Sequence, residues 1–194
     1  MKYKIILSSN SPRRKELMSG LDIPFVVKVI PNIKETYPKD LDSKDVALYI
    51  AKEKASAYLP FIKEDELVIT ADTIVVVDNR VLGKPKDECE ARQMLELLSG
   101  RVHQVITGVC LSTKRNVHSL SVSTDVEFKK LANEEIDYYI KKYKPFDKAG
   151  AYGIQEWIGY IGVTSLKGSY FNVMGLPVQR IYEEIMKIEN NVDY

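Results

Sequence analysis

The pattern of apolar and polar positions along the chain predicts several strands. Strands are expected where apolar residues, many of them β-branched, run together or alternate with polar residues. These runs lie at residues 3–7, 25–30, 67–77, 80–82, 102–112 and 117–131. Asp78-Asn79 is a suitable tight turn between the third and fourth runs, and Lys114-Arg115-Asn116 is a suitable turn between the last two.

Helices are predicted where apolar residues recur at three- and four-residue spacing after a capping residue. The expected helices cover residues 12–19, 43–59, 87–100 and 133–142, and a last one runs from near 170 or 176 to past 185. Residues 145–170 hold five of the ten glycines and are expected to be irregular. Because strands and helices do not alternate strictly, we expect an α/β fold with a mixed, twisted central sheet flanked by helices.

Composition and charge limit the classes of protein to consider. The chain has 194 residues, of which 45% are hydrophobic, and this suits one large globular domain. Its 28 basic and 27 acidic residues give a net charge of +1, so no overall field favours nucleic acid or an anionic membrane. No run of apolar residues is long enough for a signal or membrane segment, and Cys89 and Cys110 lack a metal-ligand spacing. We therefore expect a soluble intracellular protein with reduced thiols.

The segment Ser9-Asn10-Ser11-Pro12-Arg13-Arg14 closes the first predicted strand and opens the first helix. Ser11 is a good N-cap, and Pro12 is a good first helical residue. Arg13 and Arg14 then lie in the first turn, where a helix carries roughly half a positive charge. Two cations are unfavourable there unless an anion joins them, so the segment predicts a phosphate site. The alternative is that both arginines point into solvent or pair with carboxylates.

Asp72 is the sharpest single signal, because it lies near the centre of an eleven-residue strand-like run. A carboxylate buried there without a partner would be strongly destabilising. A divalent metal or an opening to a cleft would compensate for this cost. The alternative is a structural aspartate that accepts hydrogen bonds from neighbouring amides.

Other segments carry weaker signals for related chemistry. Lys84 lies between a glycine and a proline, which suits a point-charge contact with phosphate, although most loop lysines are merely solvated. Lys54 lies on a predicted helix and Glu35 in a polar loop, where charged residues are common. The glycine-rich run 147–155 allows close approach of the backbone to a ligand, or it forms only a tight loop. Its last residue, Gln155, offers a donor and an acceptor that suit the edge of a nucleobase.

The two histidines give no comparable signal. His103 and His118 lie in predicted strands without a metal-like partner, so we interpret both as structural. The sequence also lacks a Ser-His-Asp order and the Gly-x-Ser-x-Gly, Walker and zinc motifs. Covalent catalysis is therefore unsupported.

Taken together, these segments resemble the Maf family of nucleotide pyrophosphatases over nearly the whole chain. Each segment alone is a weak or moderate signal, but their joint order and spacing are highly specific. The matching segments are 7–14, Glu35, 53–55, 71–73, 83–85, 98–100, 147–155, 168–170 and 175–177. Asn10 departs from the family pattern, which usually has a small residue there, and this bears only on the packing of the loop.

The resemblance implies a single domain over residues 1–194, similar in fold to the ITPases, with an active-site cleft between two lobes. It also implies hydrolysis of a nucleoside triphosphate to the monophosphate and pyrophosphate, with a divalent cation. The family's proton acceptor falls on Asp72, and its specificity positions fall on Arg13, Thr73 and Gln155. This combination looks like the branch that acts on dTTP and UTP, rather than the branch that prefers methylated guanine nucleotides. Modified pyrimidine nucleotides are further candidate substrates.

The remaining roles follow from the chemistry of a triphosphate. Ser9, Arg14, Lys54 and Lys84 are the expected phosphate-binding residues. Mg²⁺ or Mn²⁺ would take carboxylate oxygens from Glu35 and Asp72, together with phosphate oxygens and water. The metal would acidify the attacking water, while Asp72 would position that water and accept its proton late.

The resemblance further implies a cytoplasmic homodimer that removes unwanted nucleotides from the pool, without stable nucleic-acid or membrane binding. One alternative keeps the fold but changes the substrate to deaminated purine triphosphates, which Thr73 and Gln155 mildly disfavour. The other alternative is a nucleotide-sensing regulator of septum formation and cell division with little catalysis.

Overall fold

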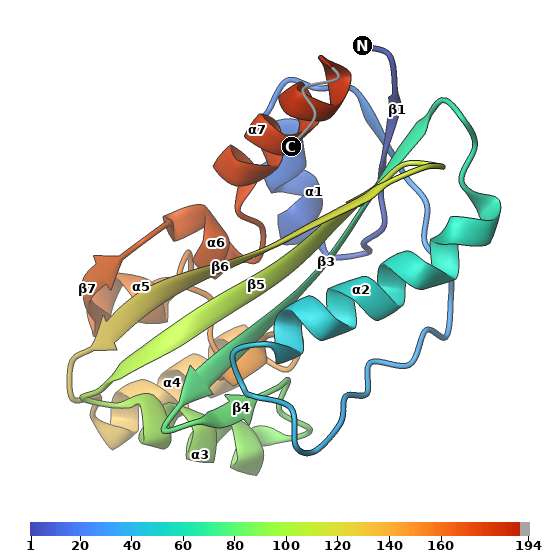
Figure 1. The fold of residues 1–194 in the computed structure, drawn as a ribbon. Coiled ribbons are helices and arrows are strands. Elements are labelled where there is room, and N and C mark those ends of the chain that lie inside the picture. The colour runs from blue at the N-terminus through green and yellow to red at the C-terminus, as the bar shows by residue number, and fades with distance from the viewer. Residues whose placement is uncertain (191–194) are drawn as a thin grey trace. The chain divides into compact units, whose positions relative to one another are not determined.

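The computed structural model describes residues 1–190 and contains a mixed sheet of seven strands flanked by helices (Figure 1). The sheet order is β2-β1-β3-β5-β6-β7, and β4 pairs with β3 outside this path. β1 is parallel to both β2 and β3. β4 runs antiparallel to β3, and β7 runs antiparallel to β6. The strands are β1 (Lys4–Leu7), β2 (Phe25–Val27), β3 (Glu66–Val77), β4 (Arg80–Leu82), β5 (Val102–Ser112), β6 (Val117–Phe128) and β7 (Val163–Lys167). The predicted α/β class with a mixed sheet is confirmed.

The helices follow the predicted segments in most places. They are α1 (Pro12–Ser19), α2 (Val46–Tyr58), α3 (Glu88–Leu98), α4 (Asn133–Tyr143), α5 (Trp157–Gly162), α6 (Tyr170–Met174) and α7 (Val178–Glu189), with 3₁₀ turns η1 (Leu59–Phe61) and η2 (Ala149–Ala151). α1 has the predicted bounds, and its cap is Ser11. Asp78 and Asn79 both adopt positive φ, at 48° and 59°, as expected for the tight turn between β3 and β4.

Several boundaries differ from the sequence-based expectation. The sequence also offers Ser43 as the cap of the second helix, but α2 begins at Val46, after a turn in which the Asp42 carboxylate accepts the Lys44 N–H at 2.9 Å, and Ser43 does not cap it. Asn133 is a capping type of residue and the sequence favours it as the cap of this helix, but it is the first residue of α4, and Glu135 accepts the N–H of Ala132 before it at 2.9 Å. The predicted strand at 25–30 ends at 27. The segment 145–170 was expected to be irregular, but it contains α5 and β7.

The chain falls into two units. The first holds Met1–Asp72, Thr107–Val122 and the segment from Gly175 on, and the second holds Thr73–Ile106 and Ser123–Met174. β3 therefore belongs to both, because the chain passes from the first unit to the second between Asp72 and Thr73. The single domain over residues 1–194 stays a prediction.

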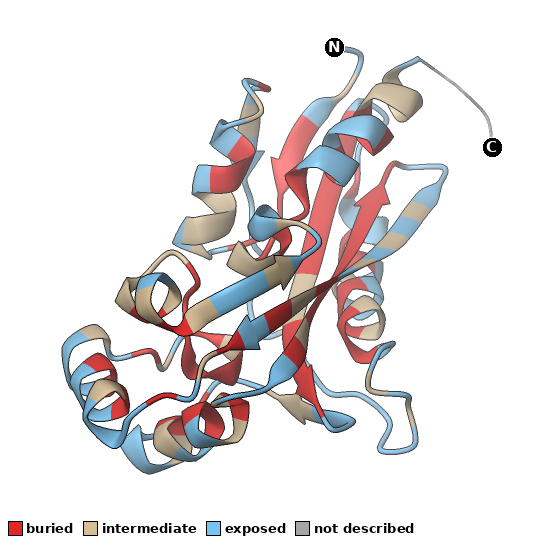
Figure 2. Cartoon of the chain, turned by 90° about the vertical axis from the view of Figure 1, so that its left-hand side faces the viewer, coloured by how far each residue is buried: buried red, intermediate tan, exposed pale blue. Residues whose placement is uncertain are grey.

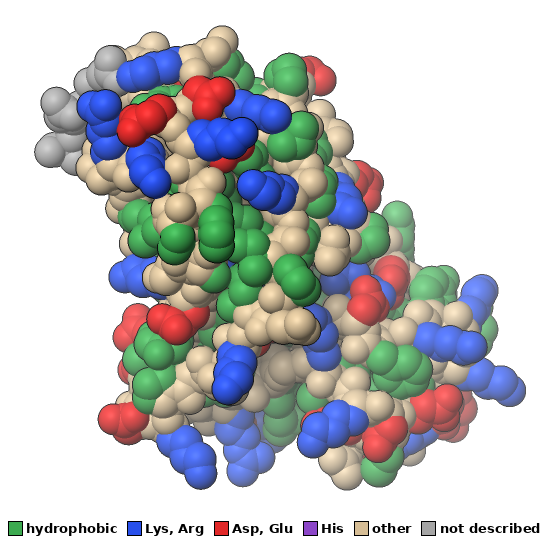
Figure 3. All heavy atoms as spheres, turned by 90° about the vertical axis from the view of Figure 1, so that its right-hand side faces the viewer, with side chains coloured by type: hydrophobic (Ala, Val, Ile, Leu, Met, Phe, Trp, Pro, Cys, Tyr) green, Lys and Arg blue, Asp and Glu red, His purple; other side chains and the backbone are tan. Residues whose placement is uncertain are grey.

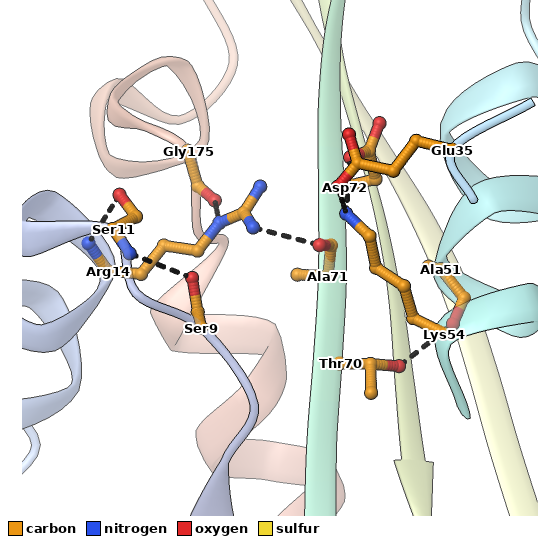
Figure 4. Close-up of polar contacts among 10 residues, drawn as sticks. All are labelled: Ser9, Ser11, Arg14, Glu35, Ala51, Lys54, Thr70, Ala71, Asp72 and Gly175. Atoms are coloured by element: carbon orange, nitrogen blue, oxygen red, sulfur yellow. Dashed lines mark hydrogen bonds and ion pairs between the residues drawn. The ribbon is translucent and has the colours of Figure 1, made fainter. Parts of the chain in front are cut away.

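In the first unit, α1 and α7 lie on one side of β3 and α2 lies on the other (Figures 1 and 4). Ile6, Tyr58 and Val68 form an apolar cluster that joins β1, α2 and β3. α2 also approaches β5 closely at Gly108, because a Cβ there would lie 2.4 Å from the Cα of Leu48. A glycine at this position lets the helix lie directly on the strand and so fixes the height of α2 above the sheet.

The second unit has an apolar core of its own. Val75, Leu95, Phe128, Tyr139 and Ile158 are all buried in it, and they come from β3, α3, β6, α4 and α5. Figure 2 shows buried residues concentrated along the central strands and on the sides of the helices that face them. The packing of this core therefore holds the loops between these elements, including the glycine-rich loop that precedes α5.

The described surface is consistent with the near-zero net charge. On the face drawn in Figure 3, basic and acidic side chains are mixed, and apolar side chains lie among them. None of the helices within residues 1–190 combines the length and the hydrophobicity that a membrane crossing requires.

Candidate functional site

The N-terminus of α1 has the local structure that the sequence predicts. The Ser11 hydroxyl accepts the Arg14 N–H at 3.5 Å, and Pro12 begins the helix. The Ser9 hydroxyl accepts the Ser11 N–H at 3.2 Å, and Ser9 itself is buried. The first turn of α1 contains no acidic residue, and Arg13 and Arg14 follow Pro12 directly in it. The positive end of the helix and two cations therefore meet at one place, which favours an anion.

Arg14 turns back toward the protein and is held by two backbone carbonyls. Its Nε donates to the Gly175 oxygen and its Nη1 to the Ala71 oxygen, both at 2.8 Å (Figure 4). Burial lowers the pKa of Arg14 and the Arg13 charge lowers it further, whereas Asp72 and Glu35 raise it. An arginine remains protonated even so. Arg14 therefore supplies a fixed positive charge beside β3, where the carbonyls of Ala71 and Gly175 hold it.

Lys54 projects from α2 toward two carboxylates. Its Nζ lies 2.8 Å from Oδ1 of Asp72 and 2.9 Å from Oε1 of Glu35 (Figure 4). The side chains of Lys54 and Asp72 are only 13% and 14% exposed, whereas that of Glu35 is 50% exposed. The structure thus brings together three of the predicted site residues, which are far apart in the sequence. They form one cationic and two anionic groups that share a partly shielded position.

The burial of β3 explains how Asp72 is accommodated in an apolar strand. Every residue of β3 is buried except Asp72 and Thr73, which are half-buried. The strand is therefore partly exposed at Asp72, the carboxylate within its apolar run. Lys54 pairs with Asp72 at this point. Next to this point, the Thr70 hydroxyl donates to the Ala51 carbonyl at 2.9 Å and attaches β3 to α2.

In the second unit, two loops with predicted site residues are joined to each other. Lys84 is exposed on the loop after β4, and the carbonyl of its neighbour Gly83 accepts the Gly150 N–H at 3.0 Å. Gly150 has a φ of 68°, and a Cβ there would lie 2.9 Å from Cγ2 of Val75, so a glycine is needed. The glycine-rich loop of Gln155 is therefore pressed against β3 and bonded to the loop of Lys84.

Gln155 ends this loop, and the oxygen of its side-chain amide lacks a hydrogen-bond donor within residues 1–190. Its Oε1 is buried and has no hydrogen-bond partner among the described residues. Buried polar atoms without a partner are uncommon in folded proteins, and a bound ligand is one way to satisfy them. The amide therefore suits a donor on an incoming molecule.

The remaining titratable candidates are not arranged as a metal centre. Among residues 1–190, no group of three or more His, Cys, Asp and Glu side chains could hold a metal ion. His103 is buried, and its Nε2 lies 2.7 Å from the Tyr152 hydroxyl, in keeping with a structural role. Cys110 is buried and Cys89 is exposed, and both are free thiols.

Sequence reasoning missed the groups that hold the predicted residues in place. The carbonyls that bind Arg14 belong to Ala71 and Gly175, and a backbone oxygen leaves no mark in a sequence. Lys148, inside the glycine-rich run, is buried and paired with Glu156 at 3.0 Å. In the sequence Lys148 lies between an aspartate and an alanine, and this pattern does not indicate that its side chain is buried.

Comparison with known proteins gives a consistent picture. A family model described as "Maf-like protein" matches residues 4–188. A protein of Phocaeicola vulgatus named dTTP/UTP pyrophosphatase is 63% identical over 187 residues, which cover 96% of this chain and 97% of that protein. A protein of Parabacteroides distasonis with the same name is 60% identical over 184 residues and 95% of both chains.

Among solved structures, a nucleoside-triphosphatase, or dITP/XTP pyrophosphatase, from Mycobacterium abscessus aligns with 97% of this chain and 97% of its own. Its sequence identity is 14% and the TM-score is 0.43.

Proposed function

The chain belongs to the Maf family, and from this premise we propose that it hydrolyses dTTP and UTP to the monophosphate and pyrophosphate. Support comes from the shared name of its relatives and from the sequence identity, which extends over nearly the full length of both chains. The proposed setting is a cytoplasmic homodimer that acts on the nucleotide pool.

One observation carries the proposal: Lys54 holds Asp72 and Glu35 around a single position beside the fixed charge of Arg14. Hydrolysis of a triphosphate requires positive groups that neutralise the phosphates and a carboxylate that receives a proton. Both kinds of group occur here, and Asp72 and Thr73 are only partly buried, whereas the other residues of β3 are buried.

A divalent cation fits the donors at this position. Two carboxylate oxygens, from Asp72 and Glu35, lie within 3 Å of one nitrogen, so they can face a common cation. Mg²⁺ is usually held by one or two carboxylates together with substrate phosphates and water. The described residues offer no third acidic, histidine or cysteine ligand, which suits a cation that arrives with the triphosphate. When bound, such a cation lowers the pKa of a coordinated water and neutralises phosphate charge.

The chain's own groups then have the following roles. Asp72 orients the attacking water and accepts its proton as the oxygen bonds to the α-phosphorus. The bond from the α-phosphorus to the bridging oxygen breaks, and the electron pair leaves with pyrophosphate. Ser9, Arg14, Lys54 and Lys84 bind the phosphates, and the three cations stabilise the negative charge; the Ser9 hydroxyl lies at the start of α1, where it accepts the Ser11 N–H. These interactions require positioning and charge rather than a covalent intermediate.

Base selection is proposed for Gln155 and Thr73, with Arg13 as a further specificity residue. The uracil and thymine edge presents O4 and an N3–H donor, and a buried amide oxygen without a partner suits such a donor. A polar reader of this kind rejects a base that leaves it unpaired. Acceptance of both dTTP and UTP means that neither the 5-methyl group nor the 2′-hydroxyl is selected.

The proposal is tested by measuring pyrophosphate release from dTTP, UTP, CTP, GTP, ITP and methylated guanine nucleotides, each with Mg²⁺, with Mn²⁺ and with a chelator. We expect release to be fastest from dTTP and UTP and to require the cation. Equal rates on purine triphosphates would refute the substrate assignment. Tight dTTP binding without turnover would instead favour the nucleotide-sensing regulator.

A further inference from the structure

Lys148 is a buried ammonium group in the second unit that the proposed reaction does not use. Its side chain is only 8% exposed, and its Nζ lies 2.7 Å from Oδ1 of Asp147 and 3.0 Å from Oε1 of Glu156. A buried charge is tolerated only when it is paired and hydrogen-bonded. Lys148 therefore draws Glu156 inward, to a position just after Gln155 in the chain.

Glu156 is held on its other side by Tyr139 of α4. The Tyr139 hydroxyl donates to Oε2 of Glu156, and the same hydroxyl accepts the Gly153 N–H at 3.1 Å. Tyr139 is fully buried, and burial together with Glu156 raises its pKa, so it stays a neutral donor. The two carboxylate oxygens of Glu156 thus have different partners, one on the glycine-rich loop and one on a core helix.

Gly153 allows these groups to close around the loop. A Cβ at Gly153 would lie 3.0 Å from Cδ of Glu156 and 3.1 Å from Cε of Lys148. The Glu156 N–H also donates to the Gly153 carbonyl at 3.0 Å. Gly153 is therefore tied to Tyr139 through its N–H and to Glu156 through its carbonyl.

Gln155 lies between these two fixed points. Its Oε1 is buried and has no hydrogen-bond partner within residues 1–190. The place from which this side chain starts is set by the backbone on either side of it. The backbone is in turn set by Lys148, Tyr139 and Glu156.

We propose that Glu156 and Lys148, acting with Tyr139, are positioning residues that fix Gln155 for discrimination between thymine or uracil and cytosine. The proposal rests on the function proposed above. Thymine and uracil present O4 and N3–H where cytosine presents an amino group and a bare N3. An amide reads that edge well only when its backbone presents it from one place, and these three residues fix the backbone on either side of Gln155.

The test compares kcat/KM for dTTP and dCTP in the wild type and in Glu156→Gln. This variant keeps the shape and an acceptor for Tyr139 but removes the charge that pairs with Lys148. We expect the dTTP/dCTP ratio to fall about tenfold through a higher KM for dTTP, with kcat for dTTP within about twofold of wild type. Tyr139→Phe, which retains the ring but leaves the Gly153 N–H unpaired, is the second variant and should act in the same direction.

The matched control is Glu135→Gln, which removes the partner of Lys129 in the same unit, a pair with an Nζ–Oε1 distance of 2.7 Å. It should leave the dTTP/dCTP ratio unchanged. A second readout is the combination of Glu156→Gln with Gln155→Ala. If Glu156 acts through Gln155, the combined variant has the ratio of Gln155→Ala alone.

Several results would overturn the inference. One is a lower melting temperature for Glu156→Gln and Tyr139→Phe with an unchanged dTTP/dCTP ratio, which is the signature of a merely structural network. Another is an effect that multiplies with that of Gln155→Ala. If the wild type prefers dTTP and the variants keep that preference, this inference alone is refuted. If the wild type hydrolyses neither nucleotide, the proposed function is refuted with it.

Discussion

The Nζ of Lys54 lies 2.8 Å from Oδ1 of Asp72, and the same nitrogen lies 2.9 Å from Oε1 of Glu35. The Lys54 ammonium group thus lies between two carboxylates. The sequence predicts a divalent cation at this same place. The same oxygens cannot hold both at close range, because a cation of charge two would repel the ammonium. A metal ion and Lys54 are therefore expected to compete for Asp72 and Glu35.

This competition predicts that Lys54→Met strengthens metal binding while it weakens turnover. Without the ammonium group, the nucleotide-free protein should bind Mn²⁺ about tenfold more tightly, because two carboxylates lose their internal counter-ion. Hydrolysis of dTTP should fall, because the phosphates lose a cation. Free Mn²⁺, followed by electron paramagnetic resonance during a titration without nucleotide, measures the affinity.

Lys52→Met is the matched control, since Lys52 is an exposed lysine on the same helix. It should leave the affinity for Mn²⁺ as in the wild type. Unchanged or weaker Mn²⁺ binding in Lys54→Met would show that Lys54 and the cation do not share these carboxylates.

Asp72→Asn should abolish most turnover without loss of the fold. The asparagine retains an oxygen for Lys54 but cannot accept a proton from water, and general-base catalysis contributes roughly 10²–10⁴-fold. We therefore expect kcat for dTTP to fall at least about 100-fold, with a small change in melting temperature, because Lys54 keeps an oxygen at this position and its pairing with Glu35. Asp78→Asn, which removes an exposed partner of Arg101, serves as the control. Intact turnover in Asp72→Asn would remove Asp72 from the mechanism.

Gly108→Ala should be strongly destabilising, because it forces α2 away from β5. The new Cβ would lie 2.4 Å from both the Cα and the N of Leu48, and backbone atoms cannot move aside by changing rotamer. Overpacking of this kind typically costs about 1–3 kcal/mol and sometimes more. Gly83→Ala is the control, since nothing lies within 4 Å of its Cβ position. Urea unfolding of both variants would refute this account of the helix position if the two midpoints were equal.

Local patterns predicted the start of α1 and the length of β3. Ser11 and Pro12 carry the helix start in the sequence itself, and the apolar run around Asp72 is long enough to identify the strand. The segment 145–170 was interpreted as irregular because glycines disfavour regular structure on their own. Packing of Ile158 in the core of the second unit nevertheless stabilises α5 there.

The contacts of the site were less accessible to sequence reasoning. Lys54 and Asp72 were both expected at the site, but their pairing joins residues that are 18 positions apart and depends on how α2 lies on the sheet. Arg14 was expected to meet phosphate, solvent or carboxylates, and its observed partners include two backbone carbonyls. A sequence pattern reports the chemistry of side chains, whereas such partners are set by the tertiary fold.

His103 gives the protein a predicted loss of stability in mild acid. Burial lowers the pKa of His103 from 6.5 to about 4, and its ring packs against Phe128 and Tyr152 in the core. Between these pH values the unfolded chain binds a proton at His103 and the folded chain does not. The stabilising contribution is therefore complete above about pH 6.5, and it is lost as the pH falls toward about 4.

His103→Gln should remove most of this pH dependence. A shift of this size corresponds to about 2 kcal/mol of unfolding free energy between pH 6.5 and pH 5. We expect the wild type to lose about that much more than the variant when urea unfolding is compared at pH 7.5 and pH 5.0. His118→Gln, which changes a half-buried histidine on β6, should behave as the wild type does. Equal losses in wild type and His103→Gln would mean that His103 takes up its proton without unfolding, and that the buried ring has access to water.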